Sequence, residues 1–289
     1  MSAGPQPWRQ QHWDWRAAAN FLLGGAGSGL AIFAALAAPA AGWQGLLVVA
    51  LALIGTGLAC VWLEIGRPLR ALNVFVNPRT SWMSRESYAA LLLFAIAGAA
   101  LAIGGDALRV ALGIAALAFL TSQARILHAS KGIPAWREPK LVPLVIATGI
   151  AEGGGIALAL DAALRSQPWM GLSLFTVAVI ARALLLGGYL RKVGPALGRE
   201  ARETLTAAGK VLRDTGTVLP LLLLATAILM PQAEAVLTAF AGLAAAHGGW
   251  RFKALLVTRA AFNQGFSIAA LPVRGTRAAG HATATRRTP

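Results

Sequence analysis

Cysteine, histidine and acidic residues are all scarce in this chain of 289 residues. It has one cysteine, Cys60, no Cys-x-x-Cys pattern and four histidines. These shortages argue against a metal site or an iron–sulfur cluster held by this chain alone. A b-type haem needs two histidines on facing helices, and only His128 and His247 end apolar segments on the same side. The sequence therefore predicts neither metal nor haem.

Motifs of soluble enzymes are missing as well. The patterns HExxH, GxSxG and GxxxxGK[ST] do not occur. Each of these patterns would place a catalytic or phosphate-binding group in a defined structural setting. We therefore do not expect this chain to turn over a soluble substrate on its own.

Charged residues make up only 13% of the chain, whereas 57% of its residues are hydrophobic. A soluble domain of this length needs far more polar surface. The net charge of +15 would favour a nucleic-acid partner in a soluble protein, but here the basic residues fall between apolar blocks. The composition predicts an all-α polytopic membrane protein whose partner is the lipid bilayer and not nucleic acid.

The apolar blocks are each about 20 residues long, which is the length that spans a bilayer. We expect eight transmembrane helices in one anchor domain at residues 18–250. An N-terminal segment at 1–17 precedes it, and a tail at 251–289, disordered after about residue 275, follows it. The expected spans are 18–38, 43–63, 87–104, 107–126, 141–162, 168–189, 211–230 and 233–249.

Basic residues are distributed unevenly between the two sides of this arrangement. All but three of the 26 Lys and Arg residues fall on one side, the exceptions being Arg109, Arg165 and Arg182. Basic loops remain in the cytoplasm of membrane proteins. Both termini and all the long loops are therefore expected in the cytoplasm.

A polar, basic strip joins the second and third expected spans. It runs from Leu63 to Glu86 and reads LEIGRPLRALNVFVNPRTSWMSRE, with Glu64 near one end and Glu86 at the other. A carboxylate at the lipid boundary can exchange protons, and an arginine such as Arg67 or Arg70 can donate hydrogen bonds to a quinone carbonyl. The strip thus favours a quinone site. The alternative is that Glu64 and Glu86 are ordinary boundary charges paired with nearby arginines.

Two further regions carry polar groups that need an explanation. Glu152 and Arg182 lie within expected spans, so they should face the bundle interior and pair with each other. They would form a proton path, a wall of the quinone pocket or a structural ion pair, or act as coupling residues if the chain is a secondary transporter. His128, at the end of the fourth span, is either a proton shuttle or head-group ligand, or a solvated interfacial side chain.

The strip EIGRPLRALNVFVNPRTSWMSRE resembles the HLGxPxRA…S-x-L-S-x-E stretch of the dimethyl sulfoxide reductase membrane-anchor family, within the polysulfide-reductase anchor superfamily. The resemblance implies eight spans, no haem, and electron exchange with menaquinone or ubiquinone. It places Arg70 and Glu86 at family quinone-site positions and Glu64 where the family has a histidine. A role for Glu64 and Glu86 in proton transfer to the quinone follows from it.

The same resemblance implies two partners, a ferredoxin-like four-cluster iron–sulfur subunit and a molybdopterin (molybdenum or tungsten) catalytic subunit. The basic loops are then expected to form the docking surface, with Arg79, Arg85, Lys131, Trp136 and Arg137. Residues 253–275 are similar to the tail of the anchor in phenylacetyl-CoA:acceptor oxidoreductase. This likeness implies a subunit of the bacterial inner membrane that passes electrons from phenylacetyl-CoA oxidation to quinone, with its partners on the cytoplasmic face.

Overall fold

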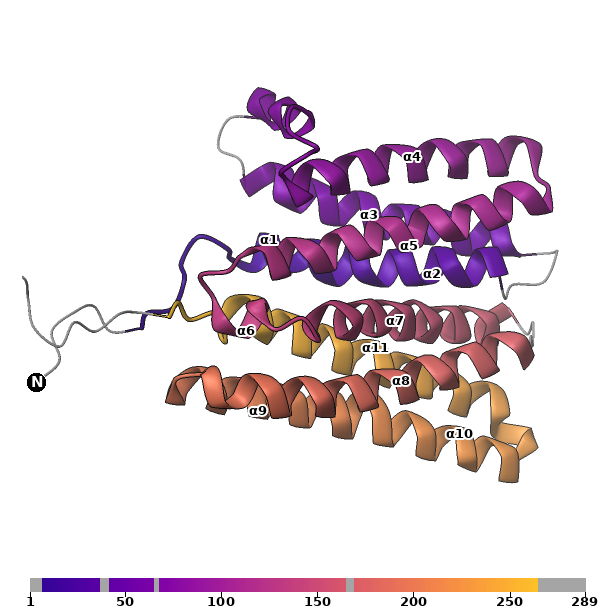
Figure 1. Cartoon of the computed structure of the whole chain (residues 1–289). Coiled ribbons are helices and arrows are strands. Elements are labelled where there is room, and N and C mark those ends of the chain that lie inside the picture. Colours follow the sequence, from indigo (N-terminus) through magenta and orange to yellow (C-terminus); the bar gives the residue numbers. More distant parts are fainter. Residues whose placement is uncertain (1–6, 37–41, 65–67, 165–168, 265–289) are drawn as a thin grey trace, which may run out of the picture.

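The computed structural model describes residues 7–36, 42–64, 68–164 and 169–264, and within these ranges the regular structure is helical (Figure 1). The prediction of an all-α protein is confirmed. Most long helices run roughly parallel to one axis. The bounds of the α-helices, short ones included, are α1 Trp15–Ala19, α2 Gly25–Leu36, α3 Trp43–Glu64, α4 Trp82–Ile103, α5 Asp106–Ala129, α6 Pro134–Arg137, α7 Leu141–Leu164, α8 Trp169–Val193, α9 Arg199–Arg213, α10 Leu219–Leu229 and α11 Glu234–Thr258.

Two of the helical rods each consist of two α-helices joined end to end by a π-helix. The π-helix η1, Asn20–Gly24, connects α1 to α2, and a second π-helix η4, Asp214–Val218, connects α9 to α10. Short 3-10 turns complete the chain at η2 Pro68–Phe75, η3 Gly194–Ala196 and η5 Pro231–Ala233. A π-turn carries one extra residue and frequently marks a functional site in an otherwise α-helical rod.

Seven helical segments among the described residues are long and apolar enough to cross a membrane. They are Trp15–Leu36, Trp43–Glu64, Trp82–Ile103, Asp106–Ala129, Leu141–Asp161, Gly171–Ala196 and Arg199–Leu229. The expected span at 211–230 is thus the second half of a longer rod that begins at Arg199. The eighth expected span corresponds to α11, which has 25 residues but is not among the seven. His247, Arg251 and Lys253 lie in its second half.

α7 lies at the centre of the bundle and packs through glycine against α2 on one side and α11 on another. A Cβ added at Gly29 would overlap the backbone of Gly149, and one at Gly155 would overlap the backbone of Gly242. Small residues allow membrane helices to approach this closely. Glycines at these positions therefore serve the packing of the helices. Outer helices such as α4 instead expose large apolar side chains, including Leu91 and Ile103, as a lipid-facing surface requires.

The tight connection between α4 and α5 follows from its sequence. Gly104 and Gly105 have φ angles of 74° and 98°, which glycine adopts without a steric penalty. The short connection expected at 104–106 is therefore confirmed.

The two ends of the described chain lie together at one end of the bundle. The backbone N–H of Gln10 donates to the carbonyl of Ala261 at 2.9 Å, and the N–H of Asn263 donates to the carbonyl of Trp8 at 3.0 Å. The expected tail therefore starts too early, because α11 continues to Thr258 and residues 259–264 pack back on the N-terminal segment. The expected disorder after about residue 275 lies outside the described residues.

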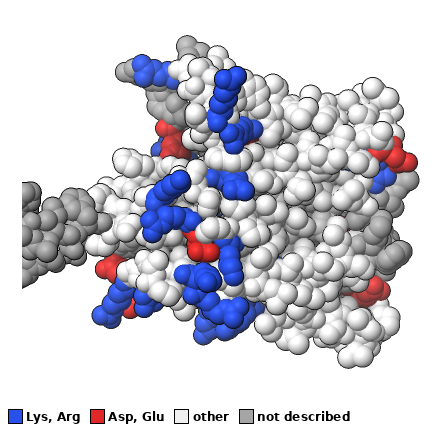
Figure 2. Space-filling view, viewed as in Figure 1, with Lys and Arg blue, Asp and Glu red and all other residues white. Residues whose placement is uncertain are grey.

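Figure 2 shows basic side chains gathered at the end of the molecule where the N-terminus lies, with few on the opposite end. This uneven distribution matches the asymmetry predicted from the sequence. We call this end the basic face; its exposed Lys and Arg side chains include Arg70, Arg79, Arg125, Lys131, Arg137, Lys140, Arg191, Lys192, Arg199, Arg202, Lys210 and Arg213.

Candidate functional site

A cavity of about 240 Å³ lies near the basic face, among α1, η1, α3, α4 and α5. Both carboxylates of the predicted quinone site contribute to its wall, so Glu64 and Glu86 are brought together from either end of the strip. Met83, which is 43% exposed, also lines it, so the cavity reaches the surface of the bundle. We call it the carboxylate cavity, and its lining residues are Trp13, Ala17, Asn20, Phe21, Val61, Glu64, Met83, Glu86 and Ile126.

Glu86 lies in the second turn of α4, and its side chain is buried. The helix starts where it does because the Ser81 side chain accepts a hydrogen bond from the N–H of Ser84, a standard N-cap. This start directs Glu86 toward the bundle. There the side-chain amide of Asn20 donates to Glu86 Oε1 at 3.1 Å. Burial of a carboxyl without such a donor would cost several kcal/mol.

Asn20 is itself held by a side chain of α5. The Gln123 side-chain amide donates to the backbone carbonyl of Asn20 at 3.1 Å. That carbonyl belongs to the π-helix η1, in which the usual α-helical pairing is broken. The oxygens Asn20 Oδ1 and Gln123 Oε1 are buried and have no hydrogen-bond partner within the described residues. Asn20, which lines the cavity, therefore carries an unused acceptor beside a buried carboxyl.

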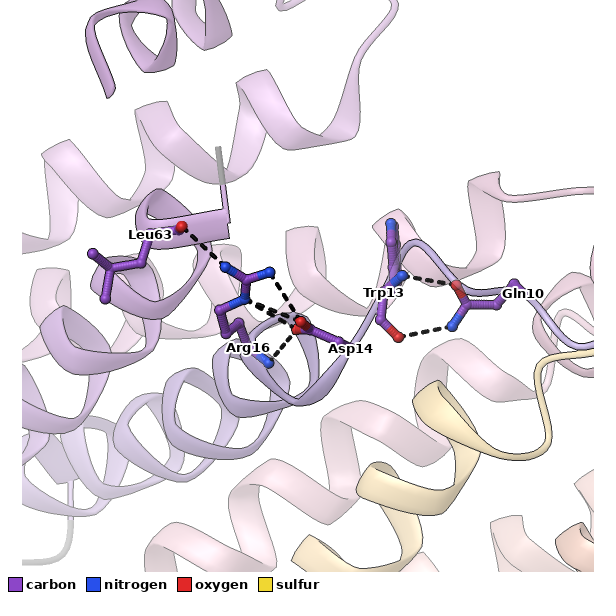
Figure 3. A network of polar contacts seen from close by, with 5 residues as sticks. All are labelled: Gln10, Trp13, Asp14, Arg16 and Leu63. Carbon is purple, nitrogen blue, oxygen red and sulfur yellow. Dashed lines mark hydrogen bonds and ion pairs between the residues drawn. The ribbon is translucent and has the colours of Figure 1, made fainter. Parts of the chain in front are cut away.

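Glu64 is the last residue of α3 and is half-buried. Among the described residues, Arg16 is a cation that lies against the end of this helix (Figure 3). Its guanidinium donates to the carbonyl of Leu63 at 3.1 Å and pairs with Asp14 at 3.0 Å. The hydrogen bond from Arg16 lowers the pKa of the Asp14 carboxyl below its usual value. The N-terminal segment therefore places the ion pair of Asp14 and Arg16 beside Glu64.

The aromatic wall of the cavity comes from the same N-terminal segment. The Gln10 side chain donates to the carbonyl of Trp13 at 2.9 Å and accepts from its N–H at 2.8 Å (Figure 3). These two hydrogen bonds hold the backbone of Trp13. Its ring stacks on Phe21 and on Trp136, with centroid distances of 5.8 and 4.9 Å. Trp13 and Phe21 both line the cavity. A flat aromatic ligand would find stacking partners there.

The described arginines of the strip do not line the cavity. Arg67 is outside the described residues, and Arg70 is exposed in η2 and does not line the cavity. Arg79 is exposed, while Arg85 is half-buried and donates to the carbonyls of Pro78 and Arg79 at 2.9 and 2.7 Å. Arg85 therefore shapes the turn before α4 more than it presents a charge for docking.

Residues 122–139, which run from the last turns of α5 through α6, include both exposed and buried side chains. His128 is half-buried in the last turn of α5 and is not among the residues that line the cavity. Lys131 and Arg137 are exposed on the basic face, and Arg137 donates to Gln264 Oε1 at 3.1 Å. Trp136 contradicts the prediction of a docking residue. It is 2% exposed, and its indole N–H donates to the carbonyl of Leu256 at 3.0 Å.

The intramembrane charges also differ from the expected pairing. Glu152 on α7 forms its ion pair with Lys253 of α11, at 2.6 Å, and both side chains are buried. Arg182 on α8 instead donates to backbone carbonyls, those of Ala245 at 3.1 Å and of Gly216 in η4. The predicted direct pair of Glu152 with Arg182 is therefore wrong, although all three groups do face the bundle interior. Lys253 was missed because the expected eighth span ended at residue 249.

Other site residues were also missed, because they lie outside the strip. Trp13, Asn20 and Gln123 come from the N-terminal segment, η1 and α5, which are distant in sequence from Glu64 and Glu86. One signal was present in the sequence. Asn20 and Gln123 are amide side chains in or beside otherwise apolar spans, and such groups need a polar partner in a membrane.

Comparison with known proteins supports the membrane-anchor interpretation. Residues 44–184 match the family model described as DMSO reductase anchor subunit (DmsC). No curated protein matches the chain. The matched range holds Glu64, Glu86 and Glu152, but it ends before α11 and begins after α1 and η1. These 141 residues, just under half of the chain, are the region that is similar to the DmsC anchor family.

Proposed function

Starting from this similarity to the DmsC anchor family, we propose that the protein is the quinone-reactive membrane subunit of a DMSO reductase-type molybdoenzyme complex. Anchors of this family associate with a catalytic subunit and an iron–sulfur subunit and bind menaquinone. The proposed task of this chain is to bind the quinone, to hold the protons it exchanges and to dock the iron–sulfur partner.

The carboxylate cavity is the observation that supports this proposal most directly. Two carboxylates, one buried and one half-buried, and two stacked aromatic rings surround a volume of about 240 Å³. That volume is slightly below the usual range of ligand pockets, about 300–1,000 Å³, and suits a ring system whose tail remains in the lipid. The geometry offers what a quinone head group needs: aromatic faces, proton-carrying groups and access from the bilayer.

A bound quinone supplies the chemistry of two electrons and two protons. Glu86 is placed to give or take a proton inside the cavity, and its hydrogen bond from Asn20 fixes which carboxyl oxygen faces the cavity. Glu64, near the exposed end of α3, is placed to exchange protons with water. Trp13 and Phe21 would stack on the ring and exclude water from Glu86. Arg16 would offset the negative charge that develops beside Glu64.

The basic face is the proposed docking surface for the iron–sulfur subunit. It is the end of the molecule at which the carboxylate cavity lies, and electron transfer requires the partner's cluster close to the quinone. Exposed Arg79, Lys131 and Arg137 would attract an acidic partner and orient it. By the positive-inside rule this face is cytoplasmic, as are both termini, with α11 as an eighth span.

Phenylacetyl-CoA is the proposed substrate of the catalytic partner. Support comes from the resemblance of residues 253–275 to the tail of that enzyme's anchor, and from the proposed cytoplasmic orientation, since coenzyme A esters are cytosolic. Co-purification with an iron–sulfur subunit separates this function from that of a secondary transporter coupled by Glu152 and Arg182, which would move solute as a lone chain in liposomes.

The variant Glu86→Gln tests the quinone site. It keeps the hydrogen bond with Asn20 but removes the ionisable group, so quinone-linked turnover by the assembled complex should fall by about 10²- to 10⁴-fold. Electron transfer from the catalytic subunit to a soluble dye should be unchanged. Glu200→Gln, at an exposed site on α9, is the matched control. Wild-type quinone-linked activity in the Glu86 variant would refute the assignment.

A further inference from the structure

Each of the two π-helices of the described chain is bound by a buried cation. Lys253 Nζ donates to the carbonyl of Phe21 in η1 at 2.5 Å, and the guanidinium of Arg182 donates to the carbonyl of Gly216 in η4. Both side chains are 1% exposed or less. A π-turn disturbs the α-helical pairing, and in a membrane any carbonyl left without a donor must find a partner inside the protein. The Phe21 carbonyl keeps the N–H of Gly25 as a backbone donor, so Lys253 adds a second hydrogen bond to it.

The π-helix η1 differs from η4 because one of its sides forms the cavity wall. Asn20 and Phe21 are adjacent residues of η1, and both line the carboxylate cavity. Their two carbonyls are held by two separate helices: the Asn20 carbonyl accepts from Gln123 of α5, and the Phe21 carbonyl accepts from Lys253 of α11. The wall is thus clamped from behind at two consecutive peptide groups.

The sequence leaves space for both clamps. A Cβ added at Gly25 would lie 2.5 Å from Lys253 Nζ, and one added at Gly24 would overlap the Gln123 amide. The glycines that end η1 and begin α2 therefore admit the two donor side chains. Glu152 completes the arrangement, since its Oε2 lies 2.6 Å from Lys253 Nζ and compensates a charge that would otherwise be costly at this depth.

We propose that Lys253 and Glu152 are positioning residues of the quinone cavity, acting through η1. Lys253 holds the π-turn that places Asn20 against Glu86 and Phe21 in the cavity wall, and Glu152 keeps Lys253 in place. This inference rests on the proposed quinone site, and it assigns a part of that site to α11, which lies outside the range matched by the anchor family.

The expected consequence of losing the clamp follows from helix geometry. A π-turn holds one residue more than an α-turn, and each residue of an α-helix turns the chain by about 100°. Relaxation of η1 to an α-helix would therefore rotate α1 relative to α2. Asn20 would leave Glu86, and Trp13 and Phe21 would no longer face the same space.

The test is quinone binding by the full chain in lipid nanodiscs. The probe is a menaquinone analogue with a short isoprenoid tail, followed by quenching of tryptophan fluorescence. Lys253→Met removes the donor to Phe21, and the double variant Lys253→Met/Glu152→Gln also removes the carboxylate left unpaired. We expect both to raise the Kd by about tenfold or more. The double variant guards against loss of folding caused by an unpaired buried charge.

Arg182→Met is the matched control. It removes an equally buried cation from the other π-helix, whose residues do not line the cavity. It should lower the thermal stability of the chain but leave the Kd within about twofold of wild type. A double variant that binds the analogue as wild type does would overturn the positioning role, as would an equal rise in Kd for Arg182→Met. Absence of binding by the wild-type chain would instead overturn the proposed quinone site itself.

Discussion

At the scale of single residues, the buried residue Asn20 connects Glu86 of α4 to Gln123 of α5. Its side chain donates to Glu86 and its backbone carbonyl accepts from Gln123. A buried carboxyl deprived of its donor pays the cost of an unmade hydrogen bond, which is about 1–3 kcal/mol. Asn20 and Glu86 should therefore act as one unit.

The variant Asn20→Ala should reduce quinone-linked turnover by about tenfold, because Glu86 loses its hydrogen-bond donor. Combination with Glu86→Gln should add little to the loss caused by Glu86→Gln alone, because the group that exchanges the proton is then already absent. Steady-state rates of the four proteins of this double-mutant cycle are the measurement. Fully additive losses would show that the contact between Asn20 and Glu86 has no role in turnover.

A second prediction at this scale concerns which arginine serves the cavity. Arg16 lies beside the end of α3, whereas Arg70 is exposed in η2 and does not line the cavity. Arg16→Gln should therefore raise the KM for quinone more than Arg70→Gln does, with dye-linked activity as the control for assembly. The reverse order would restore Arg70 to the role that the family resemblance implies.

At the scale of elements, backbone contact between central helices sets how the bundle assembles. Gly153 of α7 meets the backbone of Gly29 and Leu30 in α2, so it has no space for a methyl group. Gly98 of α4 faces open space, with nothing within 4 Å of an added Cβ. The same residue type is therefore essential at one position and dispensable at the other.

Gly153→Ala should destabilise the chain by more than the usual overpacking cost of about 1–3 kcal/mol, because backbone and not a flexible side chain must move. Gly98→Ala should be neutral or slightly stabilising, since alanine favours helix. Thermal aggregation midpoints of the two purified variants in the same detergent are the measurement. Equal midpoints would contradict the close packing of α2 on α7.

At the scale of the whole molecule, charge separates the two ends of the bundle. The basic face carries exposed Lys and Arg residues. Acidic Asp106 is the first residue of α5, and that end of α5 lies at the opposite end of the bundle (Figure 1). Electrostatic attraction of this kind affects the rate and orientation of association more than packing does. The association of the iron–sulfur partner should therefore depend on the net charge of this face.

The triple variant Arg79→Glu/Lys131→Glu/Arg137→Glu should abolish co-purification of the iron–sulfur subunit at physiological salt, because like charges would then face each other. Asp106→Lys, at the other end, should leave it unchanged. Pull-down of the complex from solubilised membranes is the measurement. Retention of the partner by the triple variant would move the docking surface away from these residues.

Trp136 shows why the docking surface was only partly predictable. A tryptophan among basic residues in a loop looks like an interface anchor, yet its ring is covered by Trp13 and its N–H by the Leu256 carbonyl. Both partners lie more than a hundred residues away in sequence. Local composition carries no information about such contacts.

The sequence by itself determined that the chain is a helical membrane protein and that its basic residues gather at one end. It also determined that Glu64 and Glu86 stand near the two ends of a polar strip. These properties follow from the length of apolar blocks and the cost of placing charge in lipid, which act locally along the chain. Only the tertiary structure decided that Asn20 meets Glu86, that Lys253 and not Arg182 pairs with Glu152, and that Arg16 accompanies Glu64. Each of those contacts depends on how helices distant in sequence rotate and pack. A shift of one helix by one residue along its neighbour would break these contacts and form others.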